Sequence, residues 1–326
     1  QVIFNGTGSS VTITALSPAT TYWFRVYEYN EGGTGSVYNT TTATNNPNSQ
    51  TTAATAPTTQ ASNIVFSSIG ATQMTVSWTN GNGSKRIVKI NTSNSFANPA
   101  NGDNPTADNS WNGTGEQVIF NGTGSSVTIT ALSPTTTYWY RVYEYNEGGT
   151  GSVYNTTTAT NNPKSQITAT PTIVISTTSL SGFVYNLGAG PSQEQTFTIS
   201  GSDLVANLSI SAPTHYEISQ TSGSGYGASL SFTPSGGTVS SKTIYVRLKA
   251  GLAVATYNDE AITASSTSAA NKTVTCSGTV YQPGITVSTT SLSAFSYILD
   301  SGPSADQSFT IGGTHLSGSI NITVPT

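Results

Sequence analysis

The sequence repeats itself at the length of whole domains. Residues 1–50 recur as residues 117–166, an offset of 116 residues. The two copies differ only at Ala19/Thr135, Phe24/Tyr140 and Asn48/Lys164. Residues 173–214 recur as residues 285–326, with 22 of 42 positions identical and an offset of 112. Such offsets are too long for one turn of a solenoid and fit single domains, so the chain is predicted to be a tandem array.

The repeat boundaries predict four modules. These are the C-terminal half of a first module (1–56), a complete copy of it (57–171), a complete module of a second type (172–282) and the N-terminal part of its next copy (283–326). Half of a β-sandwich can neither bury its inner face nor pair its edge strands. We therefore expect the natural chain to continue in both directions. Completion of the half-modules by neighbouring molecules is the alternative.

The composition excludes several classes of protein. The chain has 57 Thr and 47 Ser but only 10 Lys plus Arg and 14 Asp plus Glu, with a net charge of −4. Ten cations do not form the basic surface of a nucleic-acid binder, and no apolar run is long enough to span a bilayer. The 30 aromatic residues argue against disorder. A Thr-rich chain with a single cysteine, Cys276, is predicted to be all-β and without disulfides.

Short runs in residues 57–171 alternate apolar and polar residues, as half-buried strands do. The runs are residues 74–78, 86–90, 116–120, 126–132 and 138–145. Clusters of Gly and Asn separate them, such as NGNGS at 80–84 and NEGGTG at 146–151. This spacing predicts an all-β fold of tandem antiparallel β-sandwiches.

The second half of this module resembles the fibronectin type III pattern around its sixth strand. The matching residues are Leu132, Pro134, Thr136, Tyr138, Arg141, Val142, Asn146 and Gly149. The resemblance implies that Trp78 is the core tryptophan, and that Tyr138 and its copy Tyr22 are tyrosine corners, whose hydroxyls bond back to the chain. The run EQVIFNGTGSSVTITALSP is similar to modules in long secreted repeat proteins of gliding Gram-negative bacteria, which space, display and adhere.

Residues 172–282 resemble the immunoglobulin-like repeats that follow such modules, on the segments PTHYEIS (213–219) and IYVRLKAG (244–251). Alternation predicts strands at 172–176, 195–199, 207–211, 229–233, 242–248 and 272–280. The joint at 167–173 contains one Pro and no flexible tract. We therefore expect a semi-rigid, elongated array.

Side chains suited to catalysis are scarce. A nucleophilic triad needs a His beside Ser or Cys. The chain has two histidines, His215 and His315, and they fall in different modules. We expect each to be a surface or turn residue. Strand alternation points Glu144 inward. Because a buried carboxylate needs hydrogen-bond partners, we expect Glu144 to accept hydrogen bonds at the end of the sandwich. We do not expect it to catalyse the hydrolysis of a sugar. The chain is predicted not to be an enzyme.

The segment NGDNPTADN (101–109) offers oxygen ligands of the kind that calcium binds. Asp103 and Asp108 supply the carboxylates, and three Asn residues lie among them. The spacing differs from that of the helix–loop–helix calcium loop. An Asn/Asp-rich turn is the simpler explanation and calcium the alternative; no other cofactor is predicted.

The same alternation places four side chains on the outer face of residues 138–145. With their copies they form what we call the aromatic stripe: Trp139, Arg141, Tyr143 and Tyr145, and Trp23, Arg25, Tyr27 and Tyr29. Exposed aromatic rings can stack on sugars, and arginine can lie over an aromatic face. The stripe is a candidate glycan-binding surface. The alternative is a cation–π ladder that stiffens the sheet or packs against the neighbouring module.

Together with the resemblance to modules of secreted bacterial repeat proteins, these observations predict a non-enzymatic, extracellular structural or adhesive protein, a segment of a stalk or filament at the bacterial surface. Its expected partners are other copies of itself, neighbouring modules of a longer chain, and surface glycans; nucleic acid and a membrane span are not expected. Two alternatives stay open. One is a set of spacer modules in a secreted hydrolase whose catalytic domain lies outside residues 1–326, and the other is a glycan-binding module that uses the aromatic stripe.

Overall fold

The computed structural model describes residues 1–324, which are built from strands, turns and irregular segments. The all-β fold class predicted from the sequence is confirmed. The chain divides into two compact units, Gln1–Thr170 and Pro171–Thr326, next to the module boundary predicted at 171/172. Within the described residues, no helix is long and apolar enough to cross a membrane.

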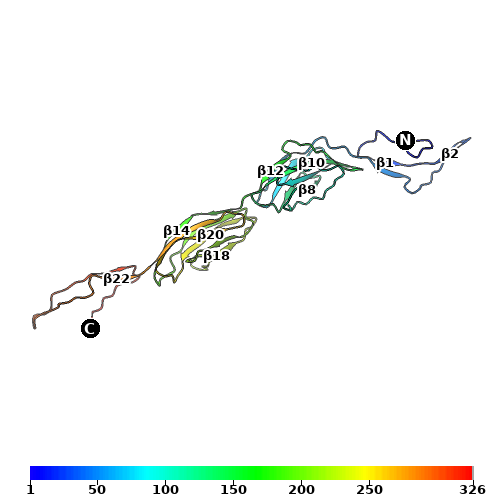
Figure 1. Ribbon diagram of the computed structural model, residues 1–326. Helices are drawn as coiled ribbons and strands as arrows, with labels where there is room; N and C mark the ends of the chain where they lie inside the picture. Colours follow the sequence, from blue (N-terminus) through cyan, green and yellow to red (C-terminus); the bar gives the residue numbers. More distant parts are fainter. Residues whose placement is uncertain (325–326) are drawn as a thin grey trace. The chain divides into compact units, whose positions relative to one another are not determined.

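Residues 62–167 of the first unit form a β-sandwich of two sheets (Figure 1). The three-stranded sheet has the order β5-β6-β9. Its strands are β5 (Ser62–Ser67), β6 (Met74–Thr79) and β9 (Ser126–Ile129). The facing sheet has the order β11-β10-β7-β8, and β12 also pairs with β10. Its strands are β7 (Lys85–Asn91), β8 (Gln117–Gly122), β10 (Thr137–Gly148), β11 (Gly151–Tyr154) and β12 (Lys164–Ile167).

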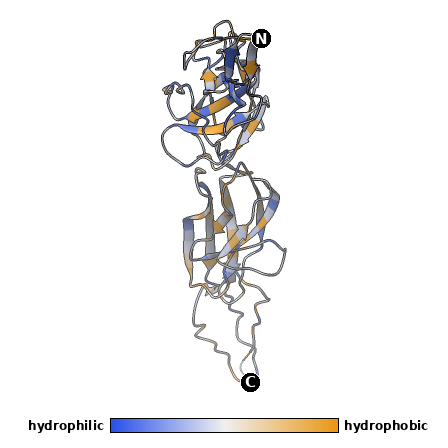
Figure 2. Cartoon of the chain, turned by 90° about the vertical axis from the view of Figure 1, so that its right-hand side faces the viewer, coloured by the Kyte–Doolittle hydropathy of each residue, from blue (hydrophilic) through white to orange (hydrophobic). Residues whose placement is uncertain are grey.

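The core of this sandwich follows from strand alternation. Met74, Val76 and Trp78 of β6 are buried, whereas the residues between them are partly exposed, because successive side chains of a strand point to opposite faces. Tyr138 and Tyr140 of β10 point into the same core. Figure 2 shows the hydrophobic positions concentrated on the strands.

Two buried side-chain amides complete the middle of β10. Along one edge, β12 pairs with the first residues of this strand and β11 with its last residues. Between them, Asn162 accepts from Val142 N–H at 3.0 Å and donates to Val142 O at 2.9 Å. Gln60 accepts from Glu144 N–H at 2.9 Å. These amides satisfy backbone groups that a strand would otherwise pair.

Residues 1–56 repeat the C-terminal half of this sandwich. β1 (Thr21–Phe24) pairs with β4 (Asn48–Thr51), and β2 (Tyr29–Gly32) with β3 (Gly35–Tyr38). These pairings have the registers of β10 with β12 and of β10 with β11. Residues 1–56 carry no counterpart of β5, β6 or β7, so many of their apolar side chains are exposed.

Residues 172–281 of the second unit form another sandwich (Figure 1). One sheet has the order β13-β15-β19-β17 and the other β14-β21-β20-β16-β18. The first contains β13 (Thr172–Ile175), β15 (Gln195–Ser202), β17 (Tyr216–Ser219) and β19 (Val239–Leu248). The second contains β14 (Ser179–Asn186), β16 (Leu208–Ser211), β18 (Ser229–Phe232), β20 (Ala255–Ser265) and β21 (Lys272–Tyr281). Phe183 and Tyr216 meet edge to face in its core, 5.3 Å between ring centroids.

This sandwich departs from the expectations in two respects. β14 runs parallel to β21, whereas the sequence led us to expect antiparallel pairs. The strands β14, β17 and β20 were not predicted, because bulges interrupt the alternation of two of them. In β20 the bulge contains Asp259, whose φ is +58°, and in β14 it contains Gly182, with φ +82°. β17 has only four residues.

The end of the chain begins a further copy of this module. β22 (Gly284–Val287) pairs antiparallel with β23 (Ile311–Thr314), in the register that joins β13 to β15. The last two residues of the predicted module 283–326 lie outside the described residues.

Candidate functional site

The buried carboxylate of Glu144 is held by an arginine and two turn amides. Arg86 Nε lies 3.1 Å from Oε1, and Arg86 Nη2 lies 3.2 Å from Oε2. The N–H groups of Gly81 and Gly83 donate to the two oxygens at 2.9 and 3.1 Å. Arg86 and Glu144 side chains are 4% and 0% exposed. The carboxylate therefore caps the end of the sandwich, as its inward position led us to expect, and its oxygens are already used.

Tyr138 and Trp78 occupy structural positions in the same module. The hydroxyl of Tyr138 accepts a hydrogen bond from Ser133 N–H at 2.9 Å, which is the geometry of a tyrosine corner. Its copy Tyr22 accepts from Ser17 N–H at the same distance. Trp78 is 5% exposed and packs edge to face on Phe120.

The aromatic stripe of the complete module is not a solvent-exposed surface. Tyr143 and Tyr145 are 0% and 1% exposed, so the expectation that they face solvent was wrong. They lie with Ile87 and Tyr154 in a small second core on the outer face of the sheet. Burial raises the pKa of Tyr143 and of Tyr154 to about 12, because the phenolate is poorly solvated there.

The other two members of the stripe remain half-buried. Trp139 and Arg141 alternate with the buried residues of β10. The guanidinium of Arg141 lies over the ring of Tyr143, 4.5 Å from its centroid, and donates to Thr156 O. This is the cation–π arrangement that the sequence left as the alternative to sugar binding.

The cover over the stripe is the segment 92–116, which joins β7 to β8. Tyr143 OH donates weakly to Asn98 at 3.4 Å, and Tyr154 OH donates to Asp103 O at 2.9 Å. Asn101 accepts from Tyr154 N–H at 3.0 Å. The segment that suggested a calcium site thus packs over the aromatic residues that suggested a sugar site.

Both ends of this cover are anchored. Lys89 Nζ lies 2.7 Å from Glu116 Oε1 and donates to Ala97 O at 2.7 Å. Trp111 is 6% exposed and packs edge to face on Tyr138, 5.6 Å between centroids. Sequence reasoning missed Trp111, because it stands in a polar, Gly- and Asn-rich stretch without alternation.

The two carboxylates proposed for calcium each serve their own turn. Asp103 Oδ2 accepts from Ala100 N–H at 3.0 Å, and Asp108 Oδ1 accepts from Ser110 N–H at 2.8 Å. In residues 1–324, no three His, Cys, Asp or Glu side chains are grouped so that they could hold a metal ion. These contacts are those of an Asn/Asp-rich turn.

The copy of the stripe in residues 1–56 has the same local contacts but no cover. Arg25 lies over Tyr27 at 4.7 Å, and Tyr29 OH donates to Asn5 at 2.6 Å, as Tyr145 does to Asn121. Trp23 is 72% and Tyr27 45% exposed. The difference lies in the cover segment, whose counterpart is not part of residues 1–56.

Among the described residues of the second unit, one histidine is paired with a carboxylate. His215 Nδ1 lies 2.6 Å from Glu260 Oε1, and its ring lies 4.6 Å from the ring of Tyr257. Cys276, opposite Glu260 on β21, is fully buried, and burial raises the pKa of its thiol to about 12. A buried, protonated thiol is a poor nucleophile. His315 lies apart from this pair, stacked on Tyr281 at 3.9 Å.

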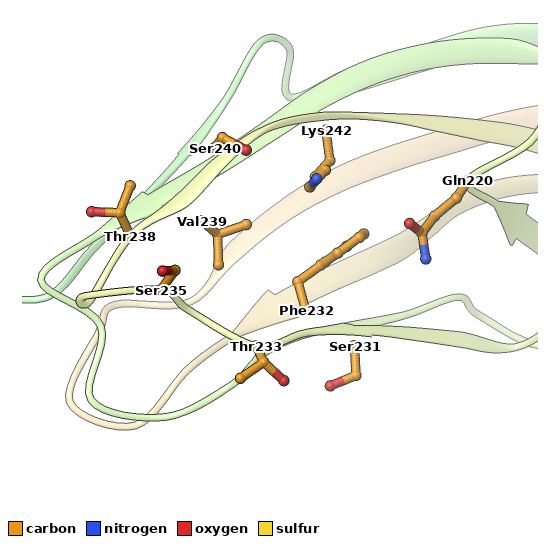
Figure 3. A pocket seen from close by; sticks show the side chains of 9 residues that line it. All are labelled: Gln220, Ser231, Phe232, Thr233, Ser235, Thr238, Val239, Ser240 and Lys242. Carbon is orange, nitrogen blue, oxygen red and sulfur yellow. The ribbon is translucent and has the colours of Figure 1, made fainter.

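An open hollow of 380 Å³ lies beside β18 and β19 (Figure 3). Phe232, Val239, Gln220 and Lys242 line it together with hydroxyl side chains. No acidic residue is among the lining side chains. General acid–base chemistry on a bound molecule has no pair of groups here to carry it.

Comparisons with known proteins agree with the fold. A family model described as the N-terminal domain of purple acid phosphatase matches residues 59–158. That domain is non-catalytic and fibronectin III-like. No curated protein matches the chain. The match spans just under a third of the chain and covers the sandwich from β5 to β11, ending before β12.

Several solved structures are distantly similar. The FN1–FN3 domains of chicken CNTN1 share 12% identity over 72% of this chain and 72% of that one, with a TM-score of 0.21. Domains d3–d4 of the rat CD45 extracellular region share 15% over 48% of this chain and 70% of that one, with a TM-score of 0.22. A fibronectin type III domain of human KIAA0970 protein shares 12% over 32% and 80%, with a TM-score of 0.19. The family match over residues 59–158 supports a fibronectin III-like fold for this sandwich.

Proposed function

We propose that this chain is a non-enzymatic segment of an extracellular stalk or filament at the bacterial surface, in which tandem β-sandwiches supply length and contact. The observation that carries this proposal is the nearly identical repetition of half a sandwich, together with the buried charges of the complete copy, which are tied into its own framework. A unit that works by number is expected to be duplicated almost unchanged. A catalytic unit gains nothing comparable from a string of copies.

The placement of the charged groups supports this role. The carboxylates of Glu144 and Glu116 bind side chains and turn amides of their own module. In the second unit, Glu217 pairs with Arg247 across neighbouring strands at 2.7 Å. Glu194 accepts hydrogen bonds from Ser222, Tyr226 and Gly223, which lower the pKa of its carboxyl. Each of these acids stabilises a turn or a sheet.

A second function is favoured by the family match. Residues 59–158 are similar to a non-catalytic domain found beside the catalytic domain of purple acid phosphatases. The modules of this chain would then be spacers in a secreted hydrolase whose catalytic domain lies elsewhere in the protein. Both functions use the sandwiches as structural units, and they differ in what the array carries.

Immunogold electron microscopy with antibodies against residues 57–170 tests the proposal on producing cells. We expect label on extended appendages at the cell surface. Native protein captured by the same antibodies is then assayed for phosphate-ester hydrolysis, and we expect none. Label confined to the cell interior would contradict the stalk, and hydrolysis by the captured protein would favour the hydrolase. Binding to a glycan array would identify the contact that the stalk makes.

A further inference from the structure

The segment that follows the first module is bound by the modules on both sides of it. Thr52 N–H donates to Thr20 O at 3.0 Å, and its hydroxyl donates to Ser17 O at 2.6 Å. The carbonyl of the same residue accepts from Gly149 N–H of the complete module at 3.0 Å. Thr52 thus connects two modules through its own backbone. The hydroxyl and amide contacts recur in the next copy, where Thr168 takes the same place.

The rest of the segment lies against the tip of the β10–β11 hairpin. Asn146 Nδ2 donates to Thr55 O at 3.0 Å, and Ala54 is only 9% exposed. A Cβ atom on Gly149 would lie 1.8 Å from Thr51 O, and one on Gly148 would lie 2.3 Å from Ala54 N. Only glycine lets the backbone of the segment approach this closely.

Contact with the segment, not the hairpin turn, requires these two glycines. Gly148 and Gly149 are not among the glycines with φ in the left-handed region. The identical sequence in the first copy shows the difference. A Cβ on Gly33 would have no atom within 4 Å, and one on Gly32 would have only Gly35 O at 3.9 Å.

We propose that the hairpin tip Asn146–Gly149 is a docking surface for the C-terminal segment of an identical module placed before it. Every module of this type carries the tip at one end and the segment at the other, so docking can continue along a row of copies. The tip Asn30–Gly33 has the same four residues and fits the same segment of an upstream copy. The partner is therefore another module of the same sequence, recognised by backbone contact over two glycines.

The segment after the complete module is different. Residues 51–55 read TTAAT, whereas residues 167–171 read ITATP and lead into a module of the second type. Proline in place of Thr55 changes the backbone where Asn146 binds its carbonyl. Docking of this kind therefore pairs fibronectin-like modules with each other. The docking proposal does not depend on the proposed role at the cell surface. If the docking proposal fails, that role still stands.

Two single substitutions in the full chain test the docking: Gly149→Ala is the test variant, and Gly33→Ala is its matched control. Elastase, whose pocket takes small side chains, can cut at Ala53 and Ala54 only when the segment leaves the tip. We expect Gly149→Ala to raise cleavage there about tenfold, the equivalent of about 1.4 kcal/mol, and Gly33→Ala to behave like wild type. Mass spectrometry maps the cuts, and tryptophan fluorescence verifies folding. Unchanged cleavage in Gly149→Ala, or equal effects of both substitutions, would overturn the proposal.

A double-mutant cycle separates docking from hairpin stability. In a second background, residues 51–55 are replaced by a longer Gly-Ser linker, which removes the stretch of chain that Gly149 contacts. We expect Gly149→Ala to lower the melting temperature of the first unit in the native background and to have no further effect in the replaced one. An equal drop in both backgrounds would mean that the glycine serves the hairpin alone, and the docking surface would be rejected.

Discussion

At the scale of single residues, buried polar side chains replace missing hydrogen-bond partners of the backbone. Asn162 and Gln60 bond the middle of β10, and Glu144 bonds the amides of the turn after β6. A buried donor or acceptor without a partner costs about 1–3 kcal/mol, so these residues specify the structure as strongly as the apolar core does. Tyr140 and Arg141 are exceptions among the described residues of β10, because the Tyr140 hydroxyl and the Arg141 Nε are buried without a hydrogen-bond partner.

Removal of the Glu144 carboxylate should be strongly destabilising. Glu144→Ala leaves the guanidinium of Arg86 buried and unpaired, and we expect a loss of about 3–5 kcal/mol from the free energy of unfolding of the module. Urea unfolding followed by tryptophan fluorescence measures it. Glu147→Ala is the matched control, because Glu147 pairs with Lys85 at the surface, and little change is expected. Equal losses of stability in the two variants would refute a special role for the buried Glu144 carboxylate.

Tyr140→Phe should not weaken the module. The hydroxyl makes no hydrogen bond, and the first copy has Phe24 at this position. We expect the free energy of unfolding to stay the same or to rise by up to about 1 kcal/mol. Tyr138→Phe is the comparison, since it removes the bond from Ser133 N–H and should destabilise. A loss above about 1 kcal/mol for Tyr140→Phe would show that the hydroxyl has a partner.

The tyrosines under the cover should make the module sensitive to alkali. The pKa of Tyr143 and of Tyr154 is raised to about 12 in the folded state, from about 10 in an unfolded chain. Their contribution to stability is therefore complete below pH 10 and is lost as the pH rises from 10 to 12. Circular dichroism and phenolate absorbance should show unfolding in this window. Tyr143→Phe should shift the transition to higher pH; an unchanged midpoint would contradict burial as its cause.

At the scale of structural elements, segments without regular secondary structure determine which sheet face is exposed. Residues 92–116 form no strand of the named sheets, yet they convert the outer face of β10 from a candidate binding surface into a second core. Their Asn and Asp side chains are used in turns and in bonds to Tyr154 and Asn121. A polar loop can therefore cover a hydrophobic face when its backbone groups find partners there.

The cover should be independent of calcium. Because Asp103 and Asp108 accept amide hydrogen bonds from their own turns, we expect the melting curve of the first unit to be the same in millimolar calcium and in chelator. Differential scanning calorimetry makes the comparison. A stabilisation by calcium that Asp103→Asn and Asp108→Asn abolish would establish a site instead.

Each unit encloses its own hydrophobic core at the scale of the whole molecule. The larger clusters lie in residues 61–142 and in residues 173–280. All four tryptophans are in the first unit, and the single cysteine is buried in the second. The sequence thus provides a separate probe for each unit.

The two units should unfold as separate transitions. Tryptophan fluorescence reports the first unit, and reaction of Cys276 with a thiol reagent reports the second, because the folded thiol is inaccessible. We expect the two urea midpoints to differ, and Glu144→Ala to move only the fluorescence transition. Coincident midpoints that shift together in this variant would show that the units unfold cooperatively.

The β-sandwich architecture, the repeat and the inward positions of β10 could be predicted from sequence patterns. Repetition and alternation are local patterns, and they are visible without a structure: Tyr138 and Glu144 lie where alternation places them. The same local logic failed at β14 and β20, where a bulge shifts the alternation, and at Trp111, which enters the core from an irregular segment.

Which surfaces remain open depends on tertiary contacts that no sequence pattern reveals. Alternation assigns Tyr143 and Tyr145 to the outer face of their sheet, but it cannot show that residues 92–116 fold back over that face. It also cannot show that Gly149 touches the segment that precedes the complete module. The physical reason is range: strand alternation depends on adjacent residues, whereas exposure and docking depend on contacts between residues far apart in the chain.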